Sequence, residues 1–492
     1  MDRRKGRILK STVFVLLAVL AAAGIVYAVG GRRSSDASDN ENNGDDATVD
    51  LSALSPADES GDDETGQAPP DMNTENAEDQ HLTESGLKYS IGPYSDEGYT
   101  LEKVVVLSRH NIRSPLTGPR SSLYSLTPYS WCEWSSPPAE LSVKGGTLET
   151  EMGQYFRRWL EAEGLFEENY RPAEDEVRIY ANSWQRTVAT ARFFSTGLLP
   201  VSNMGVEHHK GINNVDSIFY PRFTFFSSAY REDALAEMEG LYYLAMPDLS
   251  CDYRLLTDVL DMEDSDAYQK GSFTGFSMDV PTFNLSKGNE PTVNGSLKTA
   301  CQLSDALILQ YYEEPDRYSE ISGRELTGEE WEAIGEIKDI YGDVLFTSPL
   351  VAVNIAHPLL VEMDNELNEG GRRFSFICGH DSNLASVLAA LEAEDCRLPE
   401  AIEKRTPIGS KIVISCWKRE DGEEYMCMDF VYQTAAQMQN VEILDESNPP
   451  GIYGIRLKGL EMDENGLYRA SDVKGRFEEK IGEYDSLKEA YK

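Results

Sequence analysis

The residues best suited to chemistry lie together in one short segment, which contains Arg109, His110 and Arg113. Arginine side chains bind the oxygen atoms of phosphate groups through pairs of parallel hydrogen bonds. Their positive charge also disfavours protonation of a neighbouring imidazole, which leaves one ring nitrogen free to act as a nucleophile. The residue types and their spacing therefore predict phosphoryl chemistry at His110. For the Arg-His pair alone, a solvated basic turn after a strand is the simpler interpretation.

Two other segments contain residues that such chemistry requires. His380 is followed by Asp381, whose carboxyl group can donate a proton to a leaving oxygen atom. Taken alone, Asp381 or Ser382 is at least as well explained as the N-cap of the helix that follows. Arg186 lies at the start of another predicted helix, where the backbone amide groups also attract anions. An isolated arginine at such a position is more often a surface residue or an ion-pair partner.

The predicted strands bring these three segments together. Strands predicted at 104–107, 177–182 and 374–378 each end shortly before one of them, and the first is an unbroken apolar run. An unbroken apolar run is typical of a strand covered on both faces, and open α/β sheets bind ligands at the carboxyl ends of their strands. We therefore predict an α/β fold with a mixed, mostly parallel sheet flanked by helices. Further helices are predicted at 145–164 and 384–391, and further strands at 412–417 and 426–433.

Residues 205–345 have a different pattern, with polar helices around 232–244 and 293–312. Such a pattern is typical of a lid inserted into a sheet domain. We predict a smaller, mainly helical cap domain within about 117–345, inside a catalytic region that spans 91–492.

The segment Arg-His-x-x-Arg-x-Pro at 109–115 resembles the signature of the histidine acid phosphatases, the second branch of the histidine phosphatase superfamily. Most members have glycine after the histidine, whereas this chain has Asn111. The Arg-His-Asn form is similar to that of the bacterial glucose-1-phosphatases. The resemblance extends from about Gly98 to the C-terminus and includes the Gln-Arg-Thr element at 185–187.

The resemblance implies a role for each candidate residue. His110 is expected to attack phosphorus and form a phosphohistidine, and Asp381 is expected to act as the proton donor. The implied ligands of the phosphate and of the rest of the substrate are Arg109, Arg113, Arg186, His380 and Glu290. The expected enzyme is an acid phosphatase that hydrolyses sugar phosphates, with glucose 1-phosphate as the favoured substrate and without a metal or other cofactor. The alternatives are a phytase or broad-specificity acid phosphatase, or a surface protein that binds sugar phosphates without cleaving them.

The N-terminal part of the chain has the composition of a targeting segment followed by a spacer. Residues 2–10 are mostly basic and 13–29 are almost continuously apolar, which predicts a membrane anchor or a signal sequence within 1–31. We favour the anchor, because the apolar run is nearly long enough to span a bilayer. Residues 32–90 are rich in acidic and small polar side chains, which predicts a disordered spacer. The expected location is extracytoplasmic, anchored at the cell surface, or secreted if the segment is cleaved.

The whole chain has a formal net charge of −40 at pH 7. Such a charge repels nucleic acids and anionic lipids. We therefore expect a small-molecule phosphomonoester as the ligand, and contact with the membrane only through the N-terminal segment. The seven cysteines are scattered without a Cys-x-x-Cys pair, which disfavours a zinc site and shows no disulfide framework.

Overall fold

The computed structural model describes residues 87–88, 91–92, 94–116 and 121–492. The predicted anchor at 1–31 and nearly all of the predicted spacer at 32–90 lie outside these residues. Within the described ranges, no single helix is both long and apolar enough to cross a membrane. Helices α8 (Gly328–Phe346) and α9 (Pro349–Asn368) meet that criterion only as a pair bent by 85°.

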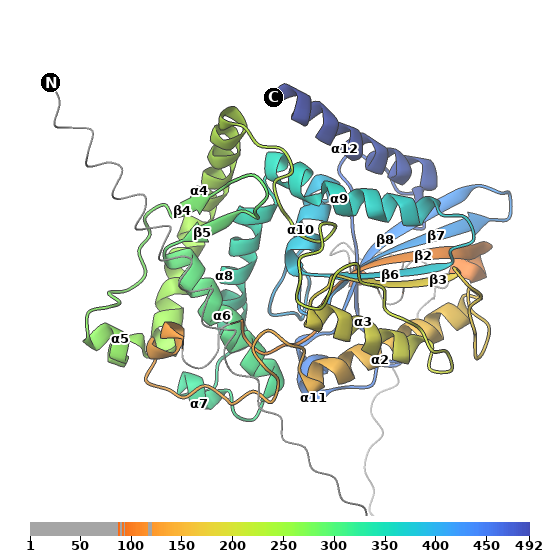
Figure 1. The fold of residues 1–492 in the computed structure, drawn as a ribbon. Helices are drawn as coiled ribbons and strands as arrows, with labels where there is room; N and C mark the ends of the chain where they lie inside the picture. The colour runs from red at the N-terminus through yellow and green to blue at the C-terminus, as the bar shows by residue number, and fades with distance from the viewer. Residues whose placement is uncertain (1–86, 89–90, 93, 117–120) are drawn as a thin grey trace, which may run out of the picture. The chain divides into compact units, whose positions relative to one another are not determined.

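An eight-stranded mixed sheet carries the three candidate segments (Figure 1). The strands are β1 (Leu87–Lys88), β2 (Tyr99–Arg109), β3 (Val177–Ala181), β6 (Phe374–Gly379), β7 (Lys411–Arg419), β8 (Glu424–Tyr432), β9 (Gly451–Gly454) and β10 (Tyr468–Arg469). Their order is β1-β9-β8-β7-β2-β6-β3, and β10 pairs with β8. β4 (Thr282–Asn284) and β5 (Thr292–Asn294) form a separate two-stranded sheet.

The prediction of a mixed α/β sheet flanked by helices is confirmed, but the prediction that most of the sheet is parallel is wrong. Only β2 with β6 and β6 with β3 pair in parallel, and the other pairs of this sheet are antiparallel. Residues 420–423 alone separate β7 from β8, and a connection this short cannot make the crossover that parallel strands require. The three strands that lead to the site, from which parallel pairing was predicted, are the parallel ones.

The remaining long helices are α2 (Val143–Ala162), α3 (Gln185–Leu198), α4 (Ser228–Val259), α6 (Ser296–Glu313), α10 (Asp381–Ala390) and α12 (Ala470–Ala490). Shorter helices are η1 (Tyr94–Glu97), η2 (Ser122–Ser125), η3 (Met262–Asp264), α5 (Asp266–Gln269), α7 (Ser319–Ser322) and α11 (Ala435–Asn440). The helix predicted at 145–164 begins earlier, because Ser142 is its N-cap and accepts a hydrogen bond from the Gly145 N–H at 3.0 Å.

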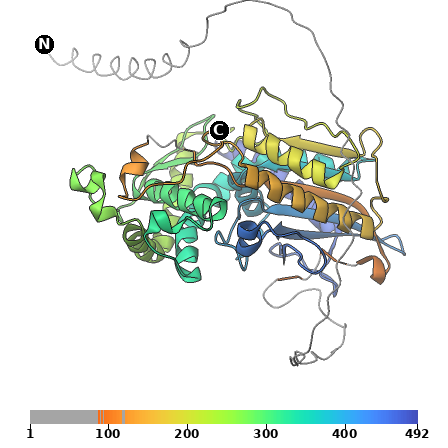
Figure 2. The ribbon, with the colours of Figure 1, turned by 90° about the horizontal axis from the view of Figure 1, so that it is seen from below.

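Strand β2 lies between two layers of helices. Val104 and Val106 pack in a hydrophobic cluster that includes side chains of α2 and α3, whereas Val105 and Leu107 pack in a cluster that includes α9, α10 and α12. All four side chains have an exposed fraction of 0%. α2 and α3, orange and yellow in Figure 2, cover one face of the sheet, and α9 and α12 lie over the other face in Figure 1. Coverage on both faces explains the unbroken apolar run at 104–107.

Helices α4, α6 and α8 pack on one another beside the sheet (Figure 1) and form a third hydrophobic cluster. The polar helix predicted at 232–244 is part of α4, and the one predicted at 293–312 corresponds to α6, which begins only at Ser296 because β5 occupies 292–294. α2, β3 and α3 also fall within 117–345 in sequence, but they pack with the sheet. The domain boundaries given above stay a prediction.

All seven cysteines lie in the described residues and are free thiols. Cys378, Cys396 and Cys427 are buried. Within the described ranges, the fold is therefore stabilised by its hydrophobic clusters and without disulfide bonds.

Candidate active site

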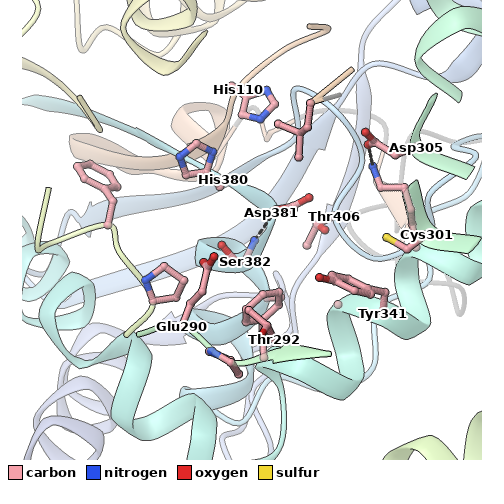
Figure 3. Close-up of a pocket in the computed structure, with 18 of the residues that line it drawn as sticks. His110, Glu290, Thr292, Cys301, Asp305, Tyr341, His380, Asp381, Ser382 and Thr406 are labelled. Carbon is pink, nitrogen blue, oxygen red and sulfur yellow. Dashed lines mark hydrogen bonds and ion pairs between the residues drawn. The ribbon is translucent and has the colours of Figure 1, made fainter. Parts of the chain in front are cut away.

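A cavity of about 460 Å³ opens between the carboxyl ends of the parallel strands and the helices α6 and α8. Its walls include six of the predicted site residues: His110, Arg113, Arg186, Glu290, His380 and Asp381. The seventh, Arg109, contacts Asp381 with 3.4 Å between Nη2 and Oδ2. These residues meet because β2, β6 and β3 are parallel neighbours, so that their carboxyl ends lie at one edge of the sheet. Figure 3 shows His110, Glu290, His380 and Asp381 around the cavity.

The imidazole of His110 is held in a defined orientation. Its backbone N–H donates to the Gly379 carbonyl at 3.1 Å, and its carbonyl accepts from the Gly409 N–H at 3.1 Å. The ring Nδ1 lies 2.9 Å from the Asn111 carbonyl, so Nδ1 carries the proton and Nε2 has a free lone pair. Burial lowers the pKa of His110 well below its usual value, and the charge of Arg186 lowers it further. The imidazole is therefore neutral at mildly acidic pH, as a nucleophile must be.

The three arginines differ in how they are held. Arg109 Nη1 donates to Glu403 Oε1 at 2.8 Å, and Arg113 Nη2 donates to Asp305 Oδ2 at 3.1 Å. Among the described residues Arg186 forms no ion pair, and its buried Nε has no hydrogen-bond acceptor. Burial and the charge of Arg113 lower the pKa of Arg186 to about 10. Arg186 is therefore a partly buried cation that no carboxylate pairs among the described residues, and an anion in the cavity would supply its partner.

His380 and Asp381 lie at the junction of β6 and α10. The N-cap of α10 is His380 rather than Asp381 or Ser382, and the His380 N–H donates to Asn383 Oδ1 at 2.9 Å. The ring centroids of His380 and His110 lie 5.4 Å apart. The side chain of Asp381 faces the cavity and is 46% exposed. The N-cap is thus His380 and the candidate proton donor is the adjacent Asp381, so capping of the helix does not occupy the carboxyl group of Asp381.

The ionisation of Asp381 depends on what occupies the cavity. The surrounding protein raises its pKa, but the charges of Arg109 and Lys338 outweigh this effect and lower the pKa to about 2. The carboxyl group of the free protein is therefore ionised at mildly acidic and neutral pH. A proton donor must instead be protonated, so Asp381 can act as one only after a phosphate dianion has entered the cavity and raised its pKa.

Glu290 extends into the cavity from the loop before β5, close to Ser382 and Thr292 (Figure 3). Burial raises the pKa of Glu290, and the charge of Asp381 raises it further. Its carboxyl group is placed to bind hydroxyl groups of a ligand whose phosphate lies beside His110. The role in substrate binding stays a prediction.

Several charged residues of the cavity wall were not identified from the sequence, and three of them contact the predicted site residues or one another: Asp305 on α6, Lys338 on α8, and Glu403 in the loop before β7. The two carboxylates hold arginines of the predicted site, and Lys338 contacts both carboxylates. Each is a single charge in a helix or loop with no recognisable spacing. Such a residue cannot be distinguished in the sequence from a solvated surface charge.

Asn111 occupies the position where the resemblance implies glycine in most family members, and its side chain makes contacts that glycine could not make. Its Nδ2 donates to Glu149 Oε2 at 2.9 Å, and Glu149 Oε1 lies 2.9 Å from Lys411 Nζ. Lys411 also donates to the carbonyl of Gly409 at 2.8 Å. Asn111 thus connects the segment that carries His110 to an ion pair whose two side chains have exposed fractions of 0%.

Comparison with known proteins agrees with this geometry. The family model described as the histidine phosphatase superfamily (branch 2) matches residues 100–220. The chain is 39% identical over 377 residues to a glucose-1-phosphatase of Salmonella typhimurium, and the alignment covers 75% of this chain and 90% of that protein. The chain belongs to the histidine phosphatase superfamily, branch 2. The family predicted from residues 109–115 is thereby confirmed.

A second relative and a solved structure are also similar to this branch 2 phosphatase. A glucose-1-phosphatase of Providencia rettgeri is 34% identical over 372 residues, which cover 74% of this chain and 88% of that protein. The solved structure of a phytase from Citrobacter braakii superimposes with a TM-score of 0.70 at 26% identity, and the match covers 77% of this chain and 98% of that chain. The same fold therefore extends over nearly the whole length of that relative.

Chemically, the site can surround one tetrahedral anion. A neutral imidazole nitrogen at His110 can attack it, cationic groups can stabilise its oxygen atoms, and Asp381 can exchange a proton with the group that leaves. Phosphoryl transfer depends mainly on positioning and on charge stabilisation, and these residues supply both.

Proposed function

We propose that this branch 2 phosphatase hydrolyses phosphate monoesters of sugars, with glucose 1-phosphate as the favoured substrate. One observation carries the proposal: the unprotonated Nε2 of His110 lies in a cavity whose wall also contains Arg186, a cation without an ion-pair partner among the described residues. A cavity for a neutral ligand would not need this charge. The two glucose-1-phosphatase relatives support the same assignment.

The proposed reaction has two steps. In the first, His110 Nε2 forms a bond to phosphorus as the bond between phosphorus and the sugar oxygen breaks, and Asp381 gives its proton to that oxygen. The sugar leaves, and a phosphohistidine remains. In the second step, Asp381 takes a proton from water, the water oxygen bonds to phosphorus, and the bond to His110 breaks. Inorganic phosphate is released and both side chains return to their starting states.

The charges around the rest of the cavity favour a substrate with one phosphoryl group. The cations Lys338 and Arg405 are already paired with carboxylates, with Arg405 Nη2 3.1 Å from Asp343 Oδ2. Glu290 adds a carboxyl group to the wall. A neutral sugar suits this surface, whereas the additional phosphates of phytate would meet two cations that already have partners and, among the described residues of the wall, one unpaired cation, Lys298 on α6. The alternative of a phytase or a broad-specificity acid phosphatase is supported by the shared fold with the Citrobacter braakii phytase.

The proposal is tested by measuring phosphate release by the full-length chain from glucose 1-phosphate, glucose 6-phosphate, p-nitrophenyl phosphate and phytate. The highest kcat/KM is expected for glucose 1-phosphate, and the His110→Ala variant should release no phosphate. A higher kcat/KM for phytate would favour the phytase alternative. Binding of sugar phosphates without any release would instead identify the non-catalytic surface protein.

We also propose that the enzyme acts outside the cytoplasm, attached to the membrane through residues 1–31 and separated from it by residues 32–90. The basic segment at 2–10, the apolar run at 13–29 and the acidic composition that follows support this location. Protease added to intact cells should release an active fragment of the catalytic region. An enzyme that stays protected until the cells are lysed would contradict the proposed location.

A further inference from the structure

Lys338 forms two ion pairs in the wall of the cavity. Its Nζ lies 2.7 Å from Asp305 Oδ1 and 2.8 Å from Glu403 Oε1. The exposed fractions of the three side chains are 8%, 13% and 3%, so these contacts are shielded from bulk water. One ammonium group on α8 therefore bridges a carboxylate on α6 and a carboxylate in the loop before β7.

Each of these carboxylates also holds one arginine of the site. Asp305 Oδ2 lies 3.1 Å from Arg113 Nη2, and Glu403 Oε1 lies 2.8 Å from Arg109 Nη1. The contacts run in sequence from Arg113 through Asp305, Lys338 and Glu403 to Arg109, and positive and negative groups alternate along them. We call these five residues the charge chain. Lys338 is its central member.

We propose that Lys338 is a positioning residue for phosphate binding, which holds Asp305 and Glu403 so that these carboxylates fix the guanidinium groups of both arginines. The inference rests on the proposed function, because the anion that the arginines would bind is the phosphoryl group of the substrate. Without Lys338, two shielded carboxylates would lose the cation between them and repel each other. The guanidinium groups of both arginines would then lose their fixed positions. Ordering them while phosphate binds costs free energy, which weakens the affinity for phosphate.

A simpler explanation is that the carboxylates only balance the charge of the arginines. The Asp305→Asn variant separates the two explanations, because it removes a negative charge close to the bound anion. If Asp305 only balances charge, phosphate will bind more tightly to this variant. If Asp305 orients Arg113, phosphate will bind more weakly even though the site has become more positive.

The test uses the full-length chain and two measurements: the Kd of inorganic phosphate by titration calorimetry, and kcat and KM for p-nitrophenyl phosphate. In Lys338→Met, phosphate binding is expected to weaken about tenfold or more, with KM rising by a similar factor and kcat falling less. The Lys338→Met/Asp305→Asn double variant should bind phosphate no more weakly than the weaker-binding single variant, because both substitutions act through the same contacts. The control is Lys270→Met, which removes an exposed ion pair with Asp266 and should leave both measurements unchanged.

Two results would overturn the inference: a Lys338→Met variant that binds phosphate as the wild type does, or an Asp305→Asn variant that binds it more tightly. If Lys338→Met fails to fold, a triple variant that adds Asp305→Asn and Glu403→Gln removes the cation and both carboxylates together. Weaker phosphate binding by that variant supports the inference, and equal or tighter binding overturns it. A wild type that binds phosphate but hydrolyses no ester refutes the proposed function alone, since the titrations still decide the role of Lys338.

Discussion

The ion pair between Glu149 and Lys411 gives the sharpest prediction about stability. The pair is completely buried, and Lys411 Nζ lies 5.7 Å and 6.0 Å from the ring centroids of Phe194 and Phe376. Its surroundings are therefore largely apolar, and water cannot replace a missing partner. We predict that Lys411→Met destabilises the protein strongly, because it leaves the charge of Glu149 buried without its cation.

The magnitude follows from the burial. Removing one partner of a buried ion pair costs about 3–5 kcal/mol. For a folded region of about 400 residues, whose unfolding entropy is about 2.1 cal/mol/K per residue, such a loss lowers the Tm by about 5 °C. The double variant Glu149→Gln/Lys411→Met removes both charges and should recover most of this loss, because no charge is then left buried without a partner.

The assay is thermal unfolding of the full-length variants, followed by circular dichroism. Lys418→Met is a matched control on the same strand, since Lys418 is 45% exposed and its contact with Glu102 is 3.7 Å long. This control should leave the Tm nearly unchanged, because exposed ion pairs contribute little. If Lys411→Met has the Tm of the wild type, or if the double variant is less stable than Lys411→Met, the reasoning about the buried pair is refuted.

Two predictions concern protons. First, the reacting complex needs neutral His110, protonated Asp381 and a phosphate dianion, which together carry as many protons as ionised Asp381 plus a substrate monoanion. Asp381 has a pKa of about 2 in the free protein and the pKa of His110 is well below its usual value, so neither group changes its charge near neutral pH. The proton must therefore come with the substrate monoanion, and kcat/KM should fall about tenfold per pH unit above the second substrate pKa near ~6. The same kcat/KM at pH 8 as at pH 5 would contradict this. Second, Asp381→Asn should slow the release of a sugar far more than the release of p-nitrophenol, because p-nitrophenol leaves without needing a proton. If the single-turnover rates for both substrates fall by the same factor, Asp381 is not the proton donor.

The parts of the fold that could be predicted are those that local pattern encodes. The unbroken apolar run at 104–107 indicated a strand covered on both faces, and β2 has helices on both faces. The three strands that end in candidate residues indicated that their carboxyl ends meet at one edge of the sheet, but the sequence did not show that β6 lies between β2 and β3. The antiparallel remainder of the sheet was mispredicted, because the residue pattern of a strand is compatible with either pairing direction.

The site likewise contains residues that could be predicted from the sequence and residues that could not. Arg109, His110 and Arg113 lie within five residues at the end of β2 and in the loop that follows, so their proximity can be predicted from the sequence. Asp305 and Lys338 lie on two different helices, and only the packing of α6 and α8 against the loop before β7 brings them to the arginines. A single charged residue in a helix has the same appearance in a sequence whether it is solvated or buried against a partner.

The central claim is that His110 becomes covalently phosphorylated during turnover. The most direct test is rapid acid-free quenching of the full-length protein with glucose 1-phosphate labelled in its phosphoryl group, followed by mass spectrometry of the peptide that contains residue 110. Up to about one labelled phosphoryl group per chain is expected on the imidazole of His110, stable in alkali, lost in acid, and absent from His110→Ala. Steady hydrolysis with no label on His110, or with the label on another residue, would contradict it.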